Sequence, residues 1–421
     1  MDSPSPSTTP PLSSAIIGAG IAGITLAIAL SEHNPSISLT IYESRKRDLS
    51  RRRLRSQRLR AMALISPKIL SAYDTVKTPN LGLEKDHLWN EFPWADTGSL
   101  ITQVESEKGF AYCNASRVHL LARLVALVPS TVVVEFEKRV VDVEGFRDGE
   151  SKGTEKMTIR FGDGMEAFAD AVCAHAVYSG KYAYRKVVPM KKALEAVGPE
   201  VQNRQMYLGK GKHVLTFAIA GGKMLNVVAF KDSGGEPWTQ RQWVLPSSKE
   251  ALLEDCPGCG ETASKILELI DEPEKWALFN HLPAPTYAKG NLCILGDAAH
   301  ATTPHLGCAI EDVHLLSSLL TPSLIRTASD IKYAFRAYDA LRRPRSQELV
   351  TRSREQGHLL DRESKLPDLK NGDREKWQEY LEREMEVNPR WVWNVDLERI
   401  LVRAKELFES LRQGGDNATD A

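Results

Sequence analysis

Residues 15–23 read AIIGAGIAG, and this stretch decides the fold of the N-terminal part of the chain. The apolar residues predict the end of a buried strand, and the helical spacing of the apolar residues that follow predicts a helix directly after the turn. Between them, Gly18, Gly20 and Gly23 have the GxGxxG spacing, which allows a tight turn, close backbone approach and close packing of helix on strand. We therefore expect a Rossmann-like unit in which the helix N-terminus faces the pyrophosphate of a dinucleotide.

A second predicted strand, residues 37–43, ends in an acidic residue. Glu43 lies twenty residues after Gly23. A carboxylate at this spacing can accept hydrogen bonds from the ribose hydroxyls of a bound dinucleotide. Strand, glycine turn, helix, strand and terminal acid together make dinucleotide binding the best supported inference from the residues alone.

A distant segment, residues 291–307, indicates a second contact to the same ligand. Its sequence, NLCILGDAAHATTPHLG, predicts a buried strand over 292–295 that ends at Gly296 and Asp297. We expect the first loop to bind the adenosine end of a cofactor and the second loop to contact its middle. Two such contacts favour a flavin dinucleotide, and therefore redox chemistry. We expect His300 and His305, beside this turn, to make structural hydrogen bonds.

Composition excludes several classes of protein. Fifty-five Lys and Arg balance 55 Asp and Glu, so no overall field recruits nucleic acid or an anionic membrane. Residues 1–14 predict a flexible tail rather than a signal peptide, and no apolar run predicts a membrane span. Six cysteines in 421 residues do not make a disulfide framework, which favours a cytoplasmic setting. Cys256 and Cys259 form a CxxC without a second ligand pair, so we expect a solvent loop and no metal site.

The apolar pattern predicts an α/β fold class with a discontinuous domain organisation. Short alternating runs between glycine-rich turns predict a separate antiparallel sheet, suited to form the floor of a substrate pocket. The expected order is a flexible tail (1–14), the first part of a Rossmann-like FAD-binding domain (15–177), an antiparallel-sheet substrate domain (178–284), the second part of the FAD-binding domain (285–345), C-terminal helices (346–412) and a tail (413–421).

Several individual elements are also predicted from periodicity. Helices are expected over 116–128, 251–270 and 310–320, and strands over Val132–Val143 and Met157–Phe161. Near the C-terminus, apolar residues from Leu397 to Leu411 recur at helical spacing and should pack on the body of the protein.

The chain resembles the class A flavoprotein monooxygenases, and within them the fungal salicylate hydroxylase-like enzymes, which share the p-hydroxybenzoate hydroxylase fold. The resemblance covers most of the chain. It is carried by GAGIAG with Glu43, by Ser116-Arg117, by SGKYAYRKVVPM (179–190), by MYLGKGKHVLTF (206–217), by GDAAHATTPHLG (296–307) and by Arg342-Arg343-Pro344-Arg345. In that family NAD(P)H reduces FAD, and the reduced flavin uses O2 to hydroxylate an electron-rich phenol.

The resemblance implies a role for each matching residue. Gly18, Gly20, Gly23 and Glu43 would hold the adenosine diphosphate part of FAD, Arg117 would reach its phosphates, Asp297 would bind the ribityl or pyrophosphate region, and Gly307 and Ala309 would belong to the loop beside the flavin ring. NADH or NADPH would be the co-substrate. The substrate would be a phenolic acid or polyketide-derived aromatic, hydroxylated with or without loss of a carboxylate, in secondary metabolism or aromatic catabolism. The assembly would be a monomer or homodimer.

On the substrate side the chemistry needs a phenolate, because electrophilic oxygen attacks a phenolate much faster than a neutral phenol. The guanidinium of Arg185 can bind a carboxylate or phenolate as a fork and lower the pKa of the phenol. Tyr182, Tyr184, Tyr207 and His213 could line the same sheet, with Tyr207 or His213 relaying the proton. Strand packing is the alternative for the aromatic residues, and a surface salt bridge is the alternative for Arg185.

Three segments depart from the family pattern. Residues 45–55 are rich in arginine where the family has a glycine-rich segment, residues 169–175 lack an Asp-Gly motif, and the loop at 307–309 is shortened to Gly-Cys-Ala. Two or three lost hydrogen bonds of about 1 kcal/mol each would weaken flavin binding by an order of magnitude or more. The departures have two explanations: missed or mistranslated exon parts in the gene model, or a non-redox descendant that serves as a scaffold or assists cyclisation. An FAD-dependent oxidase or reductase is a further alternative.

Overall fold

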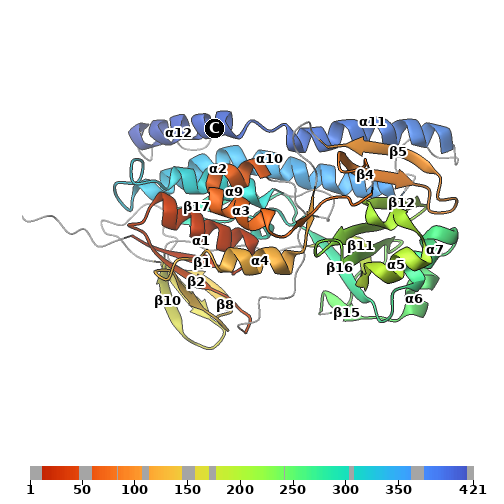
Figure 1. Ribbon diagram of the computed structural model, residues 1–421. Helices are drawn as coiled ribbons and strands as arrows, with labels where there is room; N and C mark the ends of the chain where they lie inside the picture. The colour runs from red at the N-terminus through yellow and green to blue at the C-terminus, as the bar shows by residue number, and fades with distance from the viewer. Residues whose placement is uncertain are drawn as a thin grey trace, which may run out of the picture.

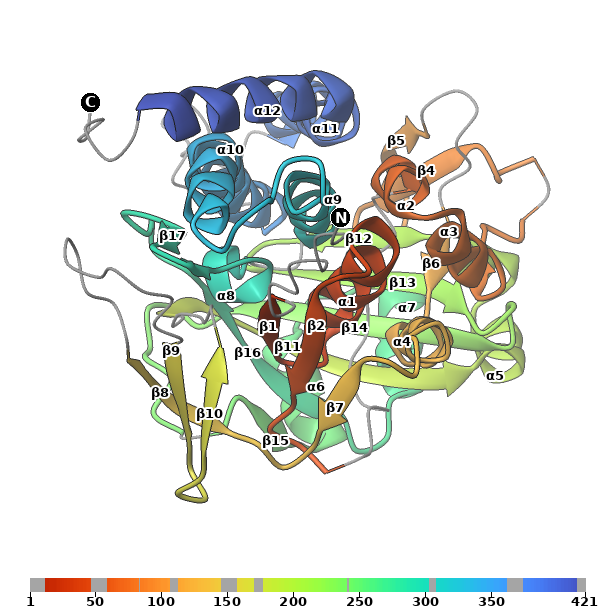
Figure 2. The same cartoon turned by 90° about the vertical axis from the view of Figure 1, so that its left-hand side faces the viewer.

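The structure is a computed structural model that describes residues 12–46, 59–82, 84–106, 113–144, 157–169, 177–240, 242–302, 308–361 and 374–414. Figure 1 shows an α/β unit beside a large sheet, with long C-terminal helices running above both. Seen from the left side of that view, the parallel strands lie in front of the large sheet (Figure 2). Within the described residues, no helix is both long and apolar enough to cross a membrane.

Three parallel strands form the sheet of the α/β unit, in the order β1-β2-β7. β1 (Ser13–Ile17) pairs with β2 (Ser38–Tyr42), and β2 pairs with β7 (Val133–Glu135). The helix α1 (Ile21–His33) joins β1 to β2 and is buried on nearly every side, which is why its sequence has no polar face. The predicted strand, turn, helix and strand are therefore confirmed.

A second, antiparallel sheet lies next to these strands, in the order β10-β9-β8. It consists of β8 (Val140–Glu144), β9 (Met157–Phe161) and β10 (Glu166–Ala169). The prediction of one strand over Val132–Val143 is wrong, because its two halves belong to different sheets. Glu137 lies between them with φ of 61°, in the left-handed region that interrupts extended backbone.

Helices from both ends of the chain share the main hydrophobic core of the α/β unit. This core contains buried residues of α1, α2 (Leu59–Ile65), α3 (Pro67–Asp74), α4 (Arg117–Val125), α9 (Ala309–Leu319), α10 (Asp330–Leu360) and α12 (Leu397–Gly414). The predicted apolar face near the C-terminus is confirmed, because Leu397, Ala404 and Phe408 of α12 are buried there. Segments that are far apart in the sequence thus share one core in this unit.

An eight-stranded sheet forms the second unit, in the order β15-β16-β11-β14-β13-β12-β4-β5. Neighbouring strands are antiparallel except β12 and β4, which are parallel. Its strands are β4 (Leu88–Pro93), β5 (Leu100–Glu105), β11 (Val177–Pro189), β12 (Gln205–Gly209), β13 (Lys212–Ile219), β14 (Met224–Asp232), β15 (Val244–Pro246) and β16 (Glu274–Asn280). The sheet is larger than predicted, because β4 and β5 come from the range assigned to the first part of the FAD-binding domain.

The two faces of this sheet have separate cores. On the face that we call the α11 face, Ala183, Met206, Leu208, Leu215 and Phe217 share a core with residues of α11 (Arg374–Trp393). On the face that we call the α7 face, Tyr184, Tyr207, Val214 and Ala218 share a core with residues of α5 (Met190–Ala196), α6 (Lys249–Asp255) and α7 (Glu261–Glu268). Neighbouring residues of a strand therefore alternate between two different environments.

Two predicted boundaries differ from the structure. The helix expected over 251–270 is divided into α6 and α7 at the CxxC segment, where Cys256 is buried rather than solvent-exposed. The helix α10 continues for 31 residues across the expected boundary at 345, with Pro344 inside it. Further short elements include β3 (Lys77–Thr78), which pairs with β6 (Asn114–Ala115), and a 3-10 helix (Pro199–Gln202).

Candidate functional site

The turn between β1 and α1 holds the predicted glycines in positions that need glycine. Gly18 has φ of +98°, which L side chains rarely adopt, and a Cβ on Gly23 would lie 2.1 Å from the carbonyl oxygen of Gly18. Gly20 is the N-cap of α1 and has no side chain with which to cap the first amides of that helix. These amides and the helix dipole make the turn suitable for an anion such as a pyrophosphate.

The two polar residues predicted for this region both lie at the glycine turn. Glu43 is 9% exposed, and its Oε2 accepts a hydrogen bond of 2.9 Å from the amide of Ala19. Arg117 is the first residue of α4, and its Nη2 lies 3.6 Å from the position that a Cβ on Gly20 would occupy. A carboxylate and a guanidinium therefore flank the turn.

The second predicted loop has a shorter strand than expected. In place of a strand over 292–295, β18 (Leu292–Cys293) pairs antiparallel with β17 (Ala288–Lys289) and is not part of the parallel sheet. The backbone turns at Gly296, which has φ of 59°, and the short helix α8 (Asp297–His300) follows. The expected turn at Gly296 is thus present, although the strand before it is short.

Gly296 brings the second loop against the first. A Cβ on Gly296 would lie 3.2 Å from the Cβ of Ala22 in α1 and 3.5 Å from the Cβ of Ala309 at the start of α9. Asp297 is exposed next to this contact. The N-termini of α1 and α9 therefore converge beside a carboxylate, an arrangement that fits an extended ligand with phosphates. Gly307 lies outside the described residues, as does His305.

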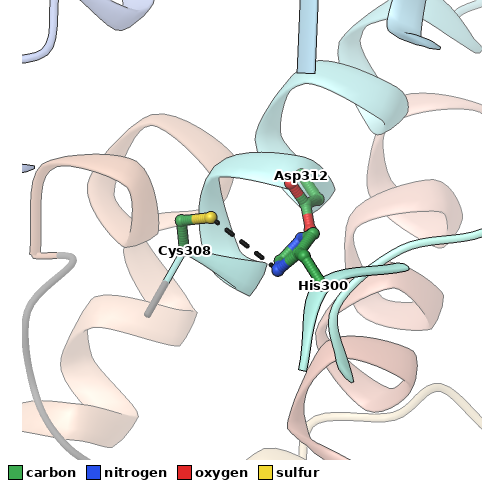
Figure 3. Close-up of side chains that lie close together, drawn as sticks. All are labelled: His300, Cys308 and Asp312. Atoms are coloured by element: carbon green, nitrogen blue, oxygen red, sulfur yellow. Dashed lines mark hydrogen bonds and ion pairs between the residues drawn. The ribbon is translucent and has the colours of Figure 1, made fainter. Parts of the chain in front are cut away.

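A buried histidine and carboxylate support this turn from behind. Nε2 of His300 lies 2.5 Å from Oδ2 of Asp312, and the same oxygen accepts a hydrogen bond of 2.9 Å from the amide of Gly296. Sγ of Cys308 lies 3.9 Å from Nδ1 of the same histidine, as Figure 3 shows. The structural hydrogen bond predicted for His300 is confirmed, but its partner was not predicted.

Two arginines extend this network through a second carboxylate. Nε of Arg342 donates to Oδ1 of Asp312 at 2.9 Å, and its Nη1 donates to Oε2 of Glu311 at 2.8 Å. Arg345 donates to Glu311 at 2.9 Å. Burial alone would raise the pKa of Asp312, but His300 and Arg342 lower it below its usual value. The Arg-Arg-Pro-Arg motif therefore holds α10 against α9 through buried ion pairs.

The three predicted catalytic residues lie on two different faces of the large sheet. Arg185 lies two residues after Ala183 in the same strand and therefore on the same side, the α11 face. It is half-buried there, with its guanidinium carbon 5.0 Å from the ring centre of Trp276. His213 lies two residues before Leu215 and also faces this side of the sheet. Tyr207 lies in the core of the α7 face. The structure brings Arg185 and His213 to a common face and separates Tyr207 from them.

The tyrosines lie on the same sheet as Arg185, as predicted, but on its opposite face. Tyr207 is 2% exposed on the α7 face, and burial raises its pKa. Tyr182 and Tyr184 point to the same side, where their hydroxyls donate to Oδ2 of Asp255 at 2.7 and 2.6 Å. The physical reason is strand alternation: an even and an odd position of one strand cannot serve the same pocket.

His213 belongs to a buried network that sequence reasoning missed. Its Nδ1 lies 2.6 Å from Oδ1 of Asp361, and Lys181 donates to Oδ2 of the same carboxylate. All three residues are at most 2% exposed, and the ring of His213 stacks on Phe230. Burial alone would raise the pKa of Asp361, but His213 and Lys181 lower it. Asp361 is the C-cap of α10, 148 residues after His213, so no local pattern indicated the pair.

Arg204 is a second buried cation that the sequence did not indicate. It is 1% exposed, and it donates to Oδ1 of Asn90 at 2.9 Å and to Oδ1 of Asn114 at 3.0 Å. Its guanidinium carbon lies 5.4 Å from the ring centre of Phe217 on the α11 face. Because Asn114 belongs to β6 and Asn90 to β4, Arg204 connects the large sheet to the segment that leads into α4.

The α11 face is continuous with the second loop of the α/β unit. Trp89 of this face lies edge-on against Trp393 of α11, with ring centres 5.4 Å apart. Trp393 in turn packs on a small core formed by Cys308, Leu349 and Val392. The α11 face, with Arg185 and His213, is therefore the face of the sheet that connects to the N-terminus of α9.

Comparisons with known proteins agree with this geometry. A family model described as an FAD binding domain matches residues 262–353. The chain is 32% identical to the 6-methylsalicylate 1-monooxygenase of Aspergillus terreus, over 97% of this chain and 95% of that protein. It is 30% identical to the salicylate hydroxylase of Sarocladium schorii, over 96% of this chain and 92% of that protein.

A solved structure shares both fold and sequence with this chain. The structure of a salicylate hydroxylase substrate complex covers 94% of this chain, and the match covers 98% of that protein. The TM-score is 0.78 at 27% sequence identity. The α/β unit, the large sheet and the C-terminal helices are thus all part of a known architecture.

Proposed function

This chain belongs to the FAD-dependent monooxygenases of the salicylate hydroxylase type, and we propose that it hydroxylates a phenolic acid with NADH or NADPH and O2. The observation that carries the proposal is the close approach of Gly296 to Ala22 and Ala309, which brings the two predicted nucleotide-binding loops together. Two of its relatives are named for salicylate or 6-methylsalicylate. We therefore propose a monocyclic or polyketide-derived aromatic acid as the substrate, in secondary metabolism.

The residues of the glycine turn fit the adenosine diphosphate part of FAD. Gly18 and Gly20 leave the backbone accessible at the N-terminus of α1, and Gly23 lets that helix pack closely on Gly18. Glu43 can reach a ribose hydroxyl, and Arg117 lies beside the turn for a phosphate. Asp297 and the first amides of α9, from Ala309, would meet the middle of the cofactor. Bound FAD would supply the redox chemistry that activates oxygen, and the chain would supply binding and orientation.

For the substrate, the α11 face supports a role for Arg185. Its guanidinium is half-buried and rests on Trp276, so it can meet a carboxylate while remaining partly desolvated. His213, with its ring fixed by Asp361, is our proposed acceptor for the phenol proton. We do not extend the proposal to Tyr207, which lies on the opposite face.

Flavin binding and turnover of the purified chain test the proposal. We expect the absorbance of bound flavin after incubation with FAD, and consumption of NADH or NADPH that 6-methylsalicylate or salicylate stimulates. Oxygen uptake should match a product that has gained one oxygen atom, with or without loss of carbon dioxide. A chain that binds no FAD, or that consumes no NAD(P)H with any phenolic acid, would contradict the proposal.

The same experiment separates the two alternatives. A non-redox scaffold would bind the aromatic acid without FAD and without NAD(P)H consumption. An oxidase would release hydrogen peroxide in proportion to substrate, and its product would contain no added oxygen. The shortened loop at 307–309, which would remove hydrogen bonds to the flavin, is the reason to test the non-redox scaffold alternative.

A further inference from the structure

Cys308, His300 and Asp312 form a cluster of three buried side chains in which the imidazole lies between the other two. One ring nitrogen, Nδ1, faces Sγ of Cys308 at 3.9 Å, and the other, Nε2, faces Oδ2 of Asp312 at 2.5 Å (Figure 3). His300 is 4% exposed, Cys308 is 2% exposed and Asp312 is fully buried. A thiol, an imidazole and a carboxylate are therefore arranged in a row.

This arrangement does not suit a metal ion, although the three ligand atoms lie within 4.8 Å of one another. Two ligands of one tetrahedral zinc ion are roughly 3.3 Å apart when each bond is about 2.0 Å. The 2.5 Å between His300 and Asp312 is too short for that, and the Asp312 oxygens already accept from Gly296 and Arg342. The geometry instead matches a row in which a carboxylate orients an imidazole toward a nucleophile.

The charges around the cluster favour an ion pair between the histidine and the cysteine. Asp312 and Glu311 are balanced by Arg342 and Arg345, all within one network of hydrogen bonds. A protonated His300 therefore adds a buried positive charge that needs a negative partner. Burial alone would lower the pKa of His300, but Asp312 and Cys308 raise it well above its usual value. A thiolate at Cys308 restores the balance.

The position of Cys308 in its helix adds to this effect. Cys308 is the N-cap of α9, an 11-residue helix, and a helix N-terminus stabilises a thiolate. The other buried cysteines give the contrast within the same chain. Cys113, Cys256 and Cys293 are 4–5% exposed, and burial raises the pKa of Cys113 and raises that of Cys256 to about 12.

We propose that Cys308 is a reactive thiol, activated by His300 and Asp312, and that peroxides oxidise it to a sulfenic acid. The thiolate sulfur attacks one oxygen of hydrogen peroxide, so that an S–O bond forms while the O–O bond breaks. Sulfur loses two electrons and the peroxide gains them. The hydroxide that leaves takes the proton from the His300 imidazolium and becomes water, which leaves His300 neutral beside a neutral sulfenic acid. This chemistry does not depend on bound FAD.

Site-resolved oxidation of the purified full chain tests the proposal. The folded protein is exposed to hydrogen peroxide for increasing times, then unfolded in the presence of dimedone, and the labelled fraction of each cysteine peptide is measured by mass spectrometry. We expect Cys308 to be oxidised at least about tenfold faster than Cys113, Cys256 and Cys293. A rate for Cys308 equal to that of these equally buried controls would overturn the proposal.

A variant and a spectroscopic measurement distinguish activation of the Cys308 thiol by His300 from simple access of peroxide to Cys308. His300→Asn should slow oxidation of Cys308 by about tenfold or more and leave the three control cysteines unchanged. If His300→Asn does not fold, the thiolate absorbance in the ultraviolet of wild type minus Cys308→Ser gives the same information. We expect that difference at neutral pH, where an unactivated thiol is largely protonated. No difference at that pH would contradict an activated thiol.

Discussion

Two buried carboxylates, Asp312 and Asp361, have the same kind of partners but serve different parts of the molecule. Each lies 2.5–2.6 Å from a histidine nitrogen and each also pairs with a basic side chain, Arg342 or Lys181. Asp312 additionally holds the backbone amide of Gly296, so its network fixes the main chain of a turn. Asp361 binds only side chains in these contacts and fixes the orientation of one imidazole.

This difference shows how the two units present functional groups. In the α/β unit, many of the proposed ligand contacts would come from backbone atoms at glycine turns, and the buried ion pair of Asp312 holds the turn at Gly296 in place. In the large sheet, contacts come from side chains whose direction depends on strand register. Substitutions in the Asp312 network should therefore affect folding and FAD binding, whereas substitutions on the sheet should affect the binding and turnover of the substrate.

The largest expected effect is on the Asp312 network. Arg342→Ala would leave Asp312 and Glu311 buried without their shared cation, and breaking such a buried pair costs about 3–5 kcal/mol of unfolding free energy. The matched control is Arg343→Ala, whose ion pair with Asp339 lies nearer the surface and should cost about 0–1 kcal/mol. Urea unfolding of both variants measures the difference; equal losses would show that the network contributes no more than a surface pair.

The next effect concerns the backbone of the glycine turn. Gly23→Ala would place a Cβ 2.1 Å from the carbonyl oxygen of Gly18, so α1 must move away from the turn. We expect FAD to bind at least about a hundredfold more weakly, equivalent to about 2.7 kcal/mol. Gly414→Ala, whose Cβ would meet nothing within 4 Å, is the control and should bind FAD normally. Unchanged affinity in Gly23→Ala, measured by flavin fluorescence titration, would place the cofactor elsewhere.

The same contrast explains which features were predictable from sequence. The turn with Gly18 and Gly23 could be predicted because spacing within one short segment determines its geometry. The side of the sheet that Tyr207 faces could not, because it depends on where a strand of only five residues begins. The partners of His213 and His300 could not either, since Asp361 and Asp312 are brought to them by packing of α10 and α9.

A substitution of Arg185 on the large sheet should change the kinetics with the substrate and leave FAD binding unchanged. Arg185→Gln should lower kcat/KM for a phenolic acid by about 10- to 100-fold, or about 1.4–2.7 kcal/mol, mainly through a higher KM, and leave FAD affinity unchanged. Tyr207→Phe removes a hydroxyl on the opposite face and should change kcat/KM by less than about threefold. Steady-state kinetics of both variants test the assignment of faces: a larger loss in Tyr207→Phe than in Arg185→Gln would reverse it.

The smallest effect is the response of the α/β unit to acid, through His314 of α9. This residue is 4% exposed, and burial, followed by the charges of His33 and Arg342, lowers its pKa to about 4. Because the unfolded chain binds a proton near pH 6.5 and the folded chain does not, stability falls as the pH decreases from about 6.5 toward 4. Between about pH 7 and 5.5 this amounts to about 1 kcal/mol. His314→Gln should remove that part of the acid sensitivity, as urea unfolding at both pH values would show, and an unchanged pH dependence would assign the acid response to other groups.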